Sequence, residues 1–193
     1  MCGDVYLPGY INVNMEIPDV SYLAEERPDL RDANVGIFPD RYYNRAYKDA
    51  IHNKRAVICD IYDDVRMLDK FPDDSVDEIV CIQGIEHLSY SDATAALIRW
   101  HKLLKDTGKL YLTVPDMPAV AEMYVKAVKY GYEDDIKWCY NEIYGTQRGA
   151  GDFHLSGYDR DLIRDTLTIA GYGTINFLHS FHDYPALFVE AMK

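Results

Sequence analysis

The stretch of sequence that decides the fold covers residues 77–114 and reads DEIVCIQGIEHLSYSDATAALIRWHKLLKDTGKLYLTV. It begins and ends with largely apolar runs, at 77–82 and 109–114, which are typical of strands buried in a sheet. Between these runs Ser91 can cap a helix and Thr107-Gly108 can end it. One face of that helix gathers Ala93, Ala96, Leu97, Trp100, Leu103 and Leu104. A strand, a helix and a second strand in this order predict two parallel neighbours in an α/β sheet.

The same alternation continues on both sides of this stretch. Further elements are expected as strands at 10–14 and 56–60, helices at 118–144 and 159–170, and a closing pair of strands at 174–181 and 186–191. The short connection between the last two strands predicts an antiparallel hairpin. The sequence therefore predicts a mostly parallel sheet with helices on both faces, in a single domain of residues 1–193 with a helical excursion at about 20–55.

The net charge and the spacing of the cysteines indicate which partners and which cellular compartment to expect. The 193 residues include 32 acids and 20 bases, a net charge of −12 at pH 7. Such a surface repels phosphate backbones and anionic lipids, so we expect neither nucleic acid nor a membrane as a partner. The four cysteines are scattered in a way that fits neither a zinc site nor a disulfide framework. With no apolar run long enough for a bilayer and no signal peptide, a cytoplasmic protein is expected.

Six segments carry a resemblance by their order along the chain. They are Cys2-Gly3-Asp4, GYINVN at 9–14, FPDDSVDEI at 71–79, Ile85-Glu86-His87-Leu88, WHKLLKDTGKL at 100–110 and Val114-Pro115-Asp116. In this order they resemble the class I S-adenosylmethionine-dependent methyltransferases, and within them the branch that modifies small molecules and sugars. The resemblance implies a Rossmann-like methyltransferase fold with S-adenosylmethionine (SAM) as the cofactor.

The start of the chain departs from the family pattern. In the family a glycine loop after the first strand approaches the methionine part of SAM, so the resemblance assigns Gly3 and Asp4 to the cofactor. Glycine suits this place because a side chain would hold the backbone away from the ligand. The preceding apolar strand is absent here or replaced, because Met1 stands where its last residues belong. Three explanations stay open: a misplaced gene start, a sheet completed by a partner chain in a homo-oligomer, and a degraded relative.

Three further residues are assigned to the adenosine part of SAM by the resemblance. Asn14 stands where the family usually has an acid that accepts from both ribose hydroxyls. An amide offers one acceptor and one donor, so binding would be weaker. Asp60 and Ile61 match the adenine site, where a carboxylate accepts from the exocyclic amine and a backbone N–H meets the ring. The alternative for Asp60 is a helix N-cap after a strand.

Two segments supply candidates for the reacting end of the site. Gln83 and Gly84 follow the strand at 77–82, where the resemblance points the methyl group at the substrate; the alternative is a simple turn. His87 and His154 are candidate general bases because imidazole titrates near neutrality, and the alternative for each is a structural histidine. Some relatives hold a metal with a Glu-His pair and an acid three residues earlier. That earlier position is Gln83, a poor ligand for a hard cation, so no metal site is expected.

These residues indicate a SAM-dependent methyltransferase acting on a small molecule or sugar, by O- or N-methylation. A second hypothesis is a catalytically inactive methyltransferase-like interaction or regulatory protein, favoured by Asn14 and by the missing strand. A third, a nucleotide-dependent oxidoreductase, lacks support because no strand is followed by GxGxxG.

Overall fold

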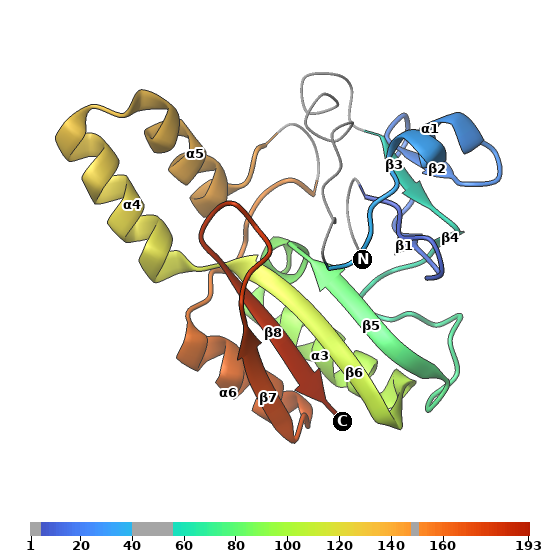
Figure 1. Cartoon of the computed structure of the whole chain (residues 1–193). Helices are drawn as coiled ribbons and strands as arrows, with labels where there is room; N and C mark the ends of the chain where they lie inside the picture. The colour runs from blue at the N-terminus through green and yellow to red at the C-terminus, as the bar shows by residue number, and fades with distance from the viewer. Residues whose placement is uncertain (1–4, 40–55, 148–150) are drawn as a thin grey trace. The chain divides into compact units, whose positions relative to one another are not determined.

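The computed structural model describes residues 5–39, 56–147 and 151–193. The chain divides into an N-terminal unit, residues 1–72, and a C-terminal unit, residues 73–193 (Figure 1). Among the described residues, no helix combines the length and the apolar character that crossing a membrane requires.

Two parallel strand pairs form the frame of the N-terminal unit. β1 (Val13–Asn14) pairs with β4 (Ile61–Tyr62), and β2 (Ser21–Leu23) pairs with β3 (Val57–Cys59). All three residues of β3 are buried, as the apolar run there predicts. The expected helical excursion contains α1 (Pro28–Ala33), which begins with a proline where a missing N–H costs no hydrogen bond. It also contains β2, which was not predicted, and its residues 40–55 lie outside the described residues.

A four-stranded sheet with the order β5-β6-β8-β7 forms the C-terminal unit (Figure 1). β5 (Val76–Ile82) and β6 (Leu104–Pro115) are parallel. β8 (Ala186–Met192) is antiparallel to both of its neighbours, β6 and β7 (Thr174–Leu178). The predicted α/β class and the C-terminal antiparallel hairpin are confirmed.

Four helices accompany this sheet. α3 (Tyr90–Leu103) and α6 (Arg160–Ala170) contact one another and lie behind the sheet in Figure 1. α4 (Met117–Tyr130) and α5 (Glu133–Tyr144) form a helical hairpin that points away from the sheet. The break between them falls at Gly131, whose φ of +74° is the left-handed conformation that favours glycine. The helices expected at 118–144 and 159–170 are therefore confirmed.

The buried face of α3 is the one that the sequence predicts, but both ends of the helix differ. Ala93, Ala96, Leu97, Trp100 and Leu103 are all buried. The N-cap is Ser89, whose hydroxyl accepts from the N–H of Asp92, so the prediction of Ser91 as the cap is wrong. The helix ends at Leu103 rather than at Thr107-Gly108, because Leu104 is already extended and pairs with Val76 of β5.

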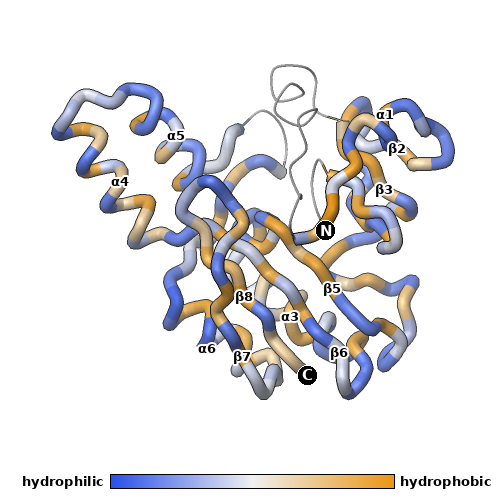
Figure 2. The backbone as a smooth tube through the Cα atoms, in the orientation of Figure 1, coloured by the Kyte–Doolittle hydropathy of each residue, from blue (hydrophilic) through white to orange (hydrophobic). Residues whose placement is uncertain are grey.

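The apolar part of β5 lies in its carboxyl-terminal half (Figure 2). Val80, Cys81 and Ile82 are buried, whereas Asp77 and Glu78 occupy the other half. The carboxyl end of β5 is thus embedded in the core, and the core fixes the position of the residues that follow it.

Candidate active site

The chain turns where β5 ends. Gln83 takes a φ of +50°, and its N–H donates to the carbonyl oxygen of Thr113 on β6 (3.0 Å). The side-chain Nε2 of Gln83 is buried and has no hydrogen-bond partner among the described residues. Gly84 then leads into η1 (Ile85–His87), a single 3-10 turn. Three predicted site residues, Gln83, Gly84 and His87, therefore gather at the carboxyl end of a parallel strand, where α/β sheets bind ligands.

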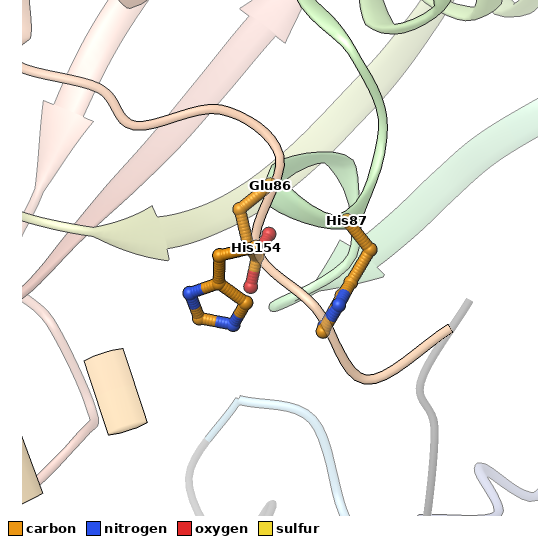
Figure 3. A group of neighbouring side chains, drawn as sticks. All are labelled: Glu86, His87 and His154. Carbon is orange, nitrogen blue, oxygen red and sulfur yellow. The ribbon is translucent and has the colours of Figure 1, made fainter. Parts of the chain in front are cut away.

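His87 and His154 lie together although they come from distant segments (Figure 3). Their ring centroids are 4.7 Å apart, in an edge-to-face arrangement. Nδ1 of His87 lies 3.1 Å from the carbonyl oxygen of Phe153, and Nδ1 of His154 lies 2.7 Å from that of Glu142. A carbonyl oxygen only accepts, so each Nδ1 carries a proton, and in the neutral form of either ring the lone pair is on Nε2. Burial lowers the pKa of His154, which favours this neutral form.

A buried acid, Glu86, and a half-buried one, Glu142, lie close to these histidines. Glu86 is fully buried, and within residues 5–39, 56–147 and 151–193 neither of its carboxylate oxygens has a hydrogen-bond partner. Burial raises the pKa of Glu86 to about 8, and the negative charge of Glu142 contributes. Burial also raises the pKa of Glu142 to about 7. The metal-binding atoms of Glu86, His87 and His154 all lie within 4.8 Å of one another.

Backbone hydrogen bonds hold the segment that carries His154 against η1. The N–H groups of Leu155 and Ser156 both donate to the carbonyl oxygen of Glu86, at 2.8 and 3.1 Å. On the other side, the N–H of His154 donates to the carbonyl oxygen of Tyr144 at the end of α5 (3.2 Å). The backbone that carries His154 is therefore held from both sides.

An open pocket of about 580 Å³ adjoins His154. Its wall combines the apolar side chains of Met117, Ile143 and Leu162 with the phenol of Tyr158. A volume of this size is within the range of small-molecule sites, and mixed apolar and polar walls are typical of them.

Thr113 and His182 are buried polar residues that the sequence did not single out. The Thr113 hydroxyl lies 3.2 Å from the N–H of Gln83 and 3.1 Å from Nε2 of His182. Burial lowers the pKa of His182 to about 4, so its ring is neutral at pH 7. These contacts connect the hairpin loop to the end of β5. No spacing in the sequence marks them, because they form between positions far apart in the chain.

In the N-terminal unit, Asp60 lies between β3 and β4 and is exposed. Its Oδ1 accepts from the hydroxyl of Tyr6 (2.9 Å), and its Oδ2 accepts from the backbone N–H (2.7 Å) and the side-chain Nδ2 (3.2 Å) of Asn12. β4 follows Asp60 directly, so the alternative role as a helix N-cap is wrong. The carboxylate instead orders the segment that precedes β1.

Asn14 and Ile61 belong to the paired strands β1 and β4, so both lie near Asp60. The side-chain oxygen of Asn14 accepts from the N–H of Met15 (2.8 Å). The N–H of Ile61, expected to meet the adenine ring, donates to the carbonyl oxygen of Asn12 at a long 3.3 Å.

The predicted residues Gly3 and Asp4 lie outside the described residues. The other seven predicted site residues form two groups. These are Asn14, Asp60 and Ile61 in the N-terminal unit, and Gln83, Gly84, His87 and His154 in the C-terminal unit.

Comparison with known proteins links part of this chain to methyl transfer. Residues 39–112 match the family model of a methyltransferase domain. The matched stretch is less than half of the chain, and it contains Asp60, Gln83 and His87. Among curated proteins, none matches this sequence significantly.

Three solved structures illustrate the structural similarity. A candidate O-methyltransferase from Nostoc punctiforme is 11% identical, with 96% of this chain and 53% of that protein covered and a TM-score of 0.48. A protein from Bordetella parapertussis, described as possibly exported, is 14% identical, with coverages of 95% and 62% and a TM-score of 0.49. A SAM-dependent methyltransferase from Archaeoglobus fulgidus is 11% identical, with coverages of 96% and 87% and a TM-score of 0.47. The chain thus spans less than two thirds of the first two proteins.

Proposed function

We propose that this chain is a SAM-dependent methyltransferase that methylates an oxygen or nitrogen of a small molecule or sugar. The observation that carries the proposal is the match of residues 39–112 to a methyltransferase domain. In this proposal residues 1–193 act as one domain in the cytoplasm. The proposed compartment rests on the scattered cysteines of the sequence, of which Cys59, Cys81 and Cys139 are buried.

The hydrogen-bonding groups of the candidate residues match those of the cofactor. A carboxylate offers about four acceptor positions, and Asp60 uses three, so one remains for the exocyclic amine of adenine. Asn14 would bind the ribose, with Ile61 beside the adenine ring. In the C-terminal unit, Gln83 supplies a buried Nε2 donor that has no partner among the residues that the structure describes. Gln83 and Gly84 would lie at the reacting end, and Gly3 and Asp4 would contact the methionine part.

Methyl transfer from SAM depends mainly on how the acceptor is positioned. SAM supplies a methyl group that its sulfonium already activates, so the protein's part is to hold the acceptor in line with it. Such positioning can supply about 7–11 kcal/mol of the barrier. A hydroxyl acceptor also loses a proton, and the candidate bases are His154 and His87, whose Nδ1 atoms face backbone carbonyl oxygens. The pocket beside His154 is large enough for a small acceptor.

Replacing Asp60 with asparagine is expected to weaken SAM binding about ten- to hundredfold, which is the effect of losing one hydrogen bond to a charged group. Asparagine keeps the size of the side chain but loses the charge and one acceptor. The affinity is measured by the SAM-dependent rise in melting temperature or by calorimetry.

The matched control is Asp69→Asn, which removes one charge from an exposed aspartate elsewhere in the same unit. Circular dichroism shows whether each variant is folded. Equal SAM affinities in the two folded variants would exclude Asp60 from the cofactor site.

A further inference from the structure

Three side chains with metal-binding atoms converge at the carboxyl end of β5 (Figure 3). Glu86 and His87 come from η1, and His154 comes from the segment that follows α5. Their ligand atoms lie within 4.8 Å of one another, all inside the C-terminal unit. Atoms that bind one ion at about 2.0–2.2 Å lie roughly 3–3.5 Å apart, so small side-chain rotations would close the set around an ion.

The hydrogen bonds of both histidines orient them as metal ligands. Each ring directs Nδ1 at a backbone carbonyl oxygen, that of Phe153 for His87 and that of Glu142 for His154. Histidine ligands in proteins characteristically donate their second N–H in this way, which fixes the tautomer and the ring. In both rings the nitrogen with the lone pair is then Nε2.

Glu86 supplies an independent observation. Its carboxylate is completely buried, and in the described part of the chain neither oxygen has a hydrogen-bond partner. Buried carboxylates without partners are costly, and the neighbouring charged group Glu142 is itself an acid. A cation bound between Glu86 and the two histidines would supply the missing counter-charge.

We propose that Glu86, His87 and His154 bind a divalent first-row transition cation such as Zn²⁺, Fe²⁺, Mn²⁺ or Co²⁺. Two imidazole nitrogens with one carboxylate suit these ions, and this set leaves coordination positions open for a ligand or water. Mg²⁺ and Ca²⁺ prefer oxygen ligands throughout. The sequence argues against a metal because Gln83 is a poor ligand. In the folded chain His154 supplies the third ligand instead.

The test is a titration of the full chain, stripped with a chelator, with Co²⁺ and with Zn²⁺ in calorimetry. The wild type is expected to bind about one ion per chain, with a visible Co²⁺ spectrum that reports nitrogen and oxygen ligands. Glu86→Gln and His154→Ala are expected to lower the affinity at least about tenfold. The control His179→Ala removes an exposed histidine and should bind as the wild type does.

A second measurement needs no variant. In the wild type, Co²⁺ should shift the imidazole proton resonances of His87 and His154 and leave those of His179 in place. The proposal is overturned if no stoichiometric binding is seen, if Glu86→Gln and His154→Ala bind like the wild type, or if Co²⁺ shifts other histidines instead. These assays contain no SAM, so their failure would leave the proposed methyl transfer standing, and a failure to bind SAM would leave the metal site standing.

Discussion

Replacing His154 with alanine is expected to slow methyl transfer to a hydroxyl acceptor by a factor of about 10²–10⁴, which is the usual contribution of a positioned base. The affinity for SAM should stay close to that of the wild type, because the proposed cofactor residues do not include His154. The structure supports a base here because Nδ1 donates to the carbonyl oxygen of Glu142, which leaves the lone pair on Nε2. An ion at the proposed metal site would occupy the same lone pair, so this prediction applies to protein treated with a chelator. Burial lowers the pKa of His154, so most of the protein carries the neutral ring at pH 7.

The measurement is the initial rate of S-adenosylhomocysteine (SAH) formation at saturating SAM, with the metal content of each sample determined in parallel. His179→Ala serves as the control, and added imidazole should restore part of the rate of His154→Ala. A structural histidine would give a different result: SAM affinity and melting temperature would fall with the rate, and imidazole would restore nothing.

Gly145→Ala is expected to destabilise the C-terminal unit by about 3 kcal/mol or more, a large effect for one methyl group. Gly145 ends α5 with a φ of +76° and a ψ of 167°, a region that is open essentially to glycine alone. An added Cβ would lie 1.7 Å from the carbonyl oxygen of Asp152 and 2.9 Å from the backbone nitrogen of His154. Because these are backbone atoms, the segment that carries His154 has to move.

Gly131→Ala is the matched control for this effect. Gly131 ends α4 with a similar φ of +74°, but an added Cβ there meets nothing within 4 Å. That variant should lose only the cost of the left-handed conformation, about 1 kcal/mol. Chemical denaturation measures both free energies of unfolding. Similar losses in the two variants would show that the segment at Gly145 accommodates the methyl group, and that it does not fix His154 as described.

The core of the C-terminal unit can be predicted from the sequence because its apolar residues recur at a regular, short spacing. The spacing of Ala93, Ala96, Leu97 and Trp100 predicts the buried face of α3, and all four are buried. The C-terminal end of that helix is harder to predict, because Leu104 joins a strand through pairing with β5. Short β2 has no signal of its own, since its strand character depends on pairing with β3.

The sequence predicts single residues of the candidate site, but it does not predict that they come together. The sequence marks His87 and His154 separately as candidate bases. Their contact depends on the N–H groups of Leu155 and Ser156 donating to the carbonyl oxygen of Glu86, and no sequence pattern encodes such backbone bonds. The prediction of no metal considered only the sequence neighbours of the Glu-His pair, whereas the structure places His154, from a distant loop, beside that pair.

Asp60, in the N-terminal unit, is another residue whose contacts the sequence does not predict. Its position after a buried strand predicts a polar role, and the structure confirms the strand. Its present partners, Tyr6 and Asn12, lie roughly 50 residues earlier, so their contacts with Asp60 could not be read from spacing.

The most direct test of methyltransferase function is a calorimetric titration of the intact chain with SAH, which has no reactive methyl group and therefore reports binding alone. We expect saturable binding of about one SAH per chain, with adenosine binding more weakly because it lacks the amino-acid part. If neither SAH nor SAM produces saturable heat or raises the melting temperature, the chain does not use this cofactor. The hypothesis of a catalytically inactive interaction protein would then replace the proposed enzyme.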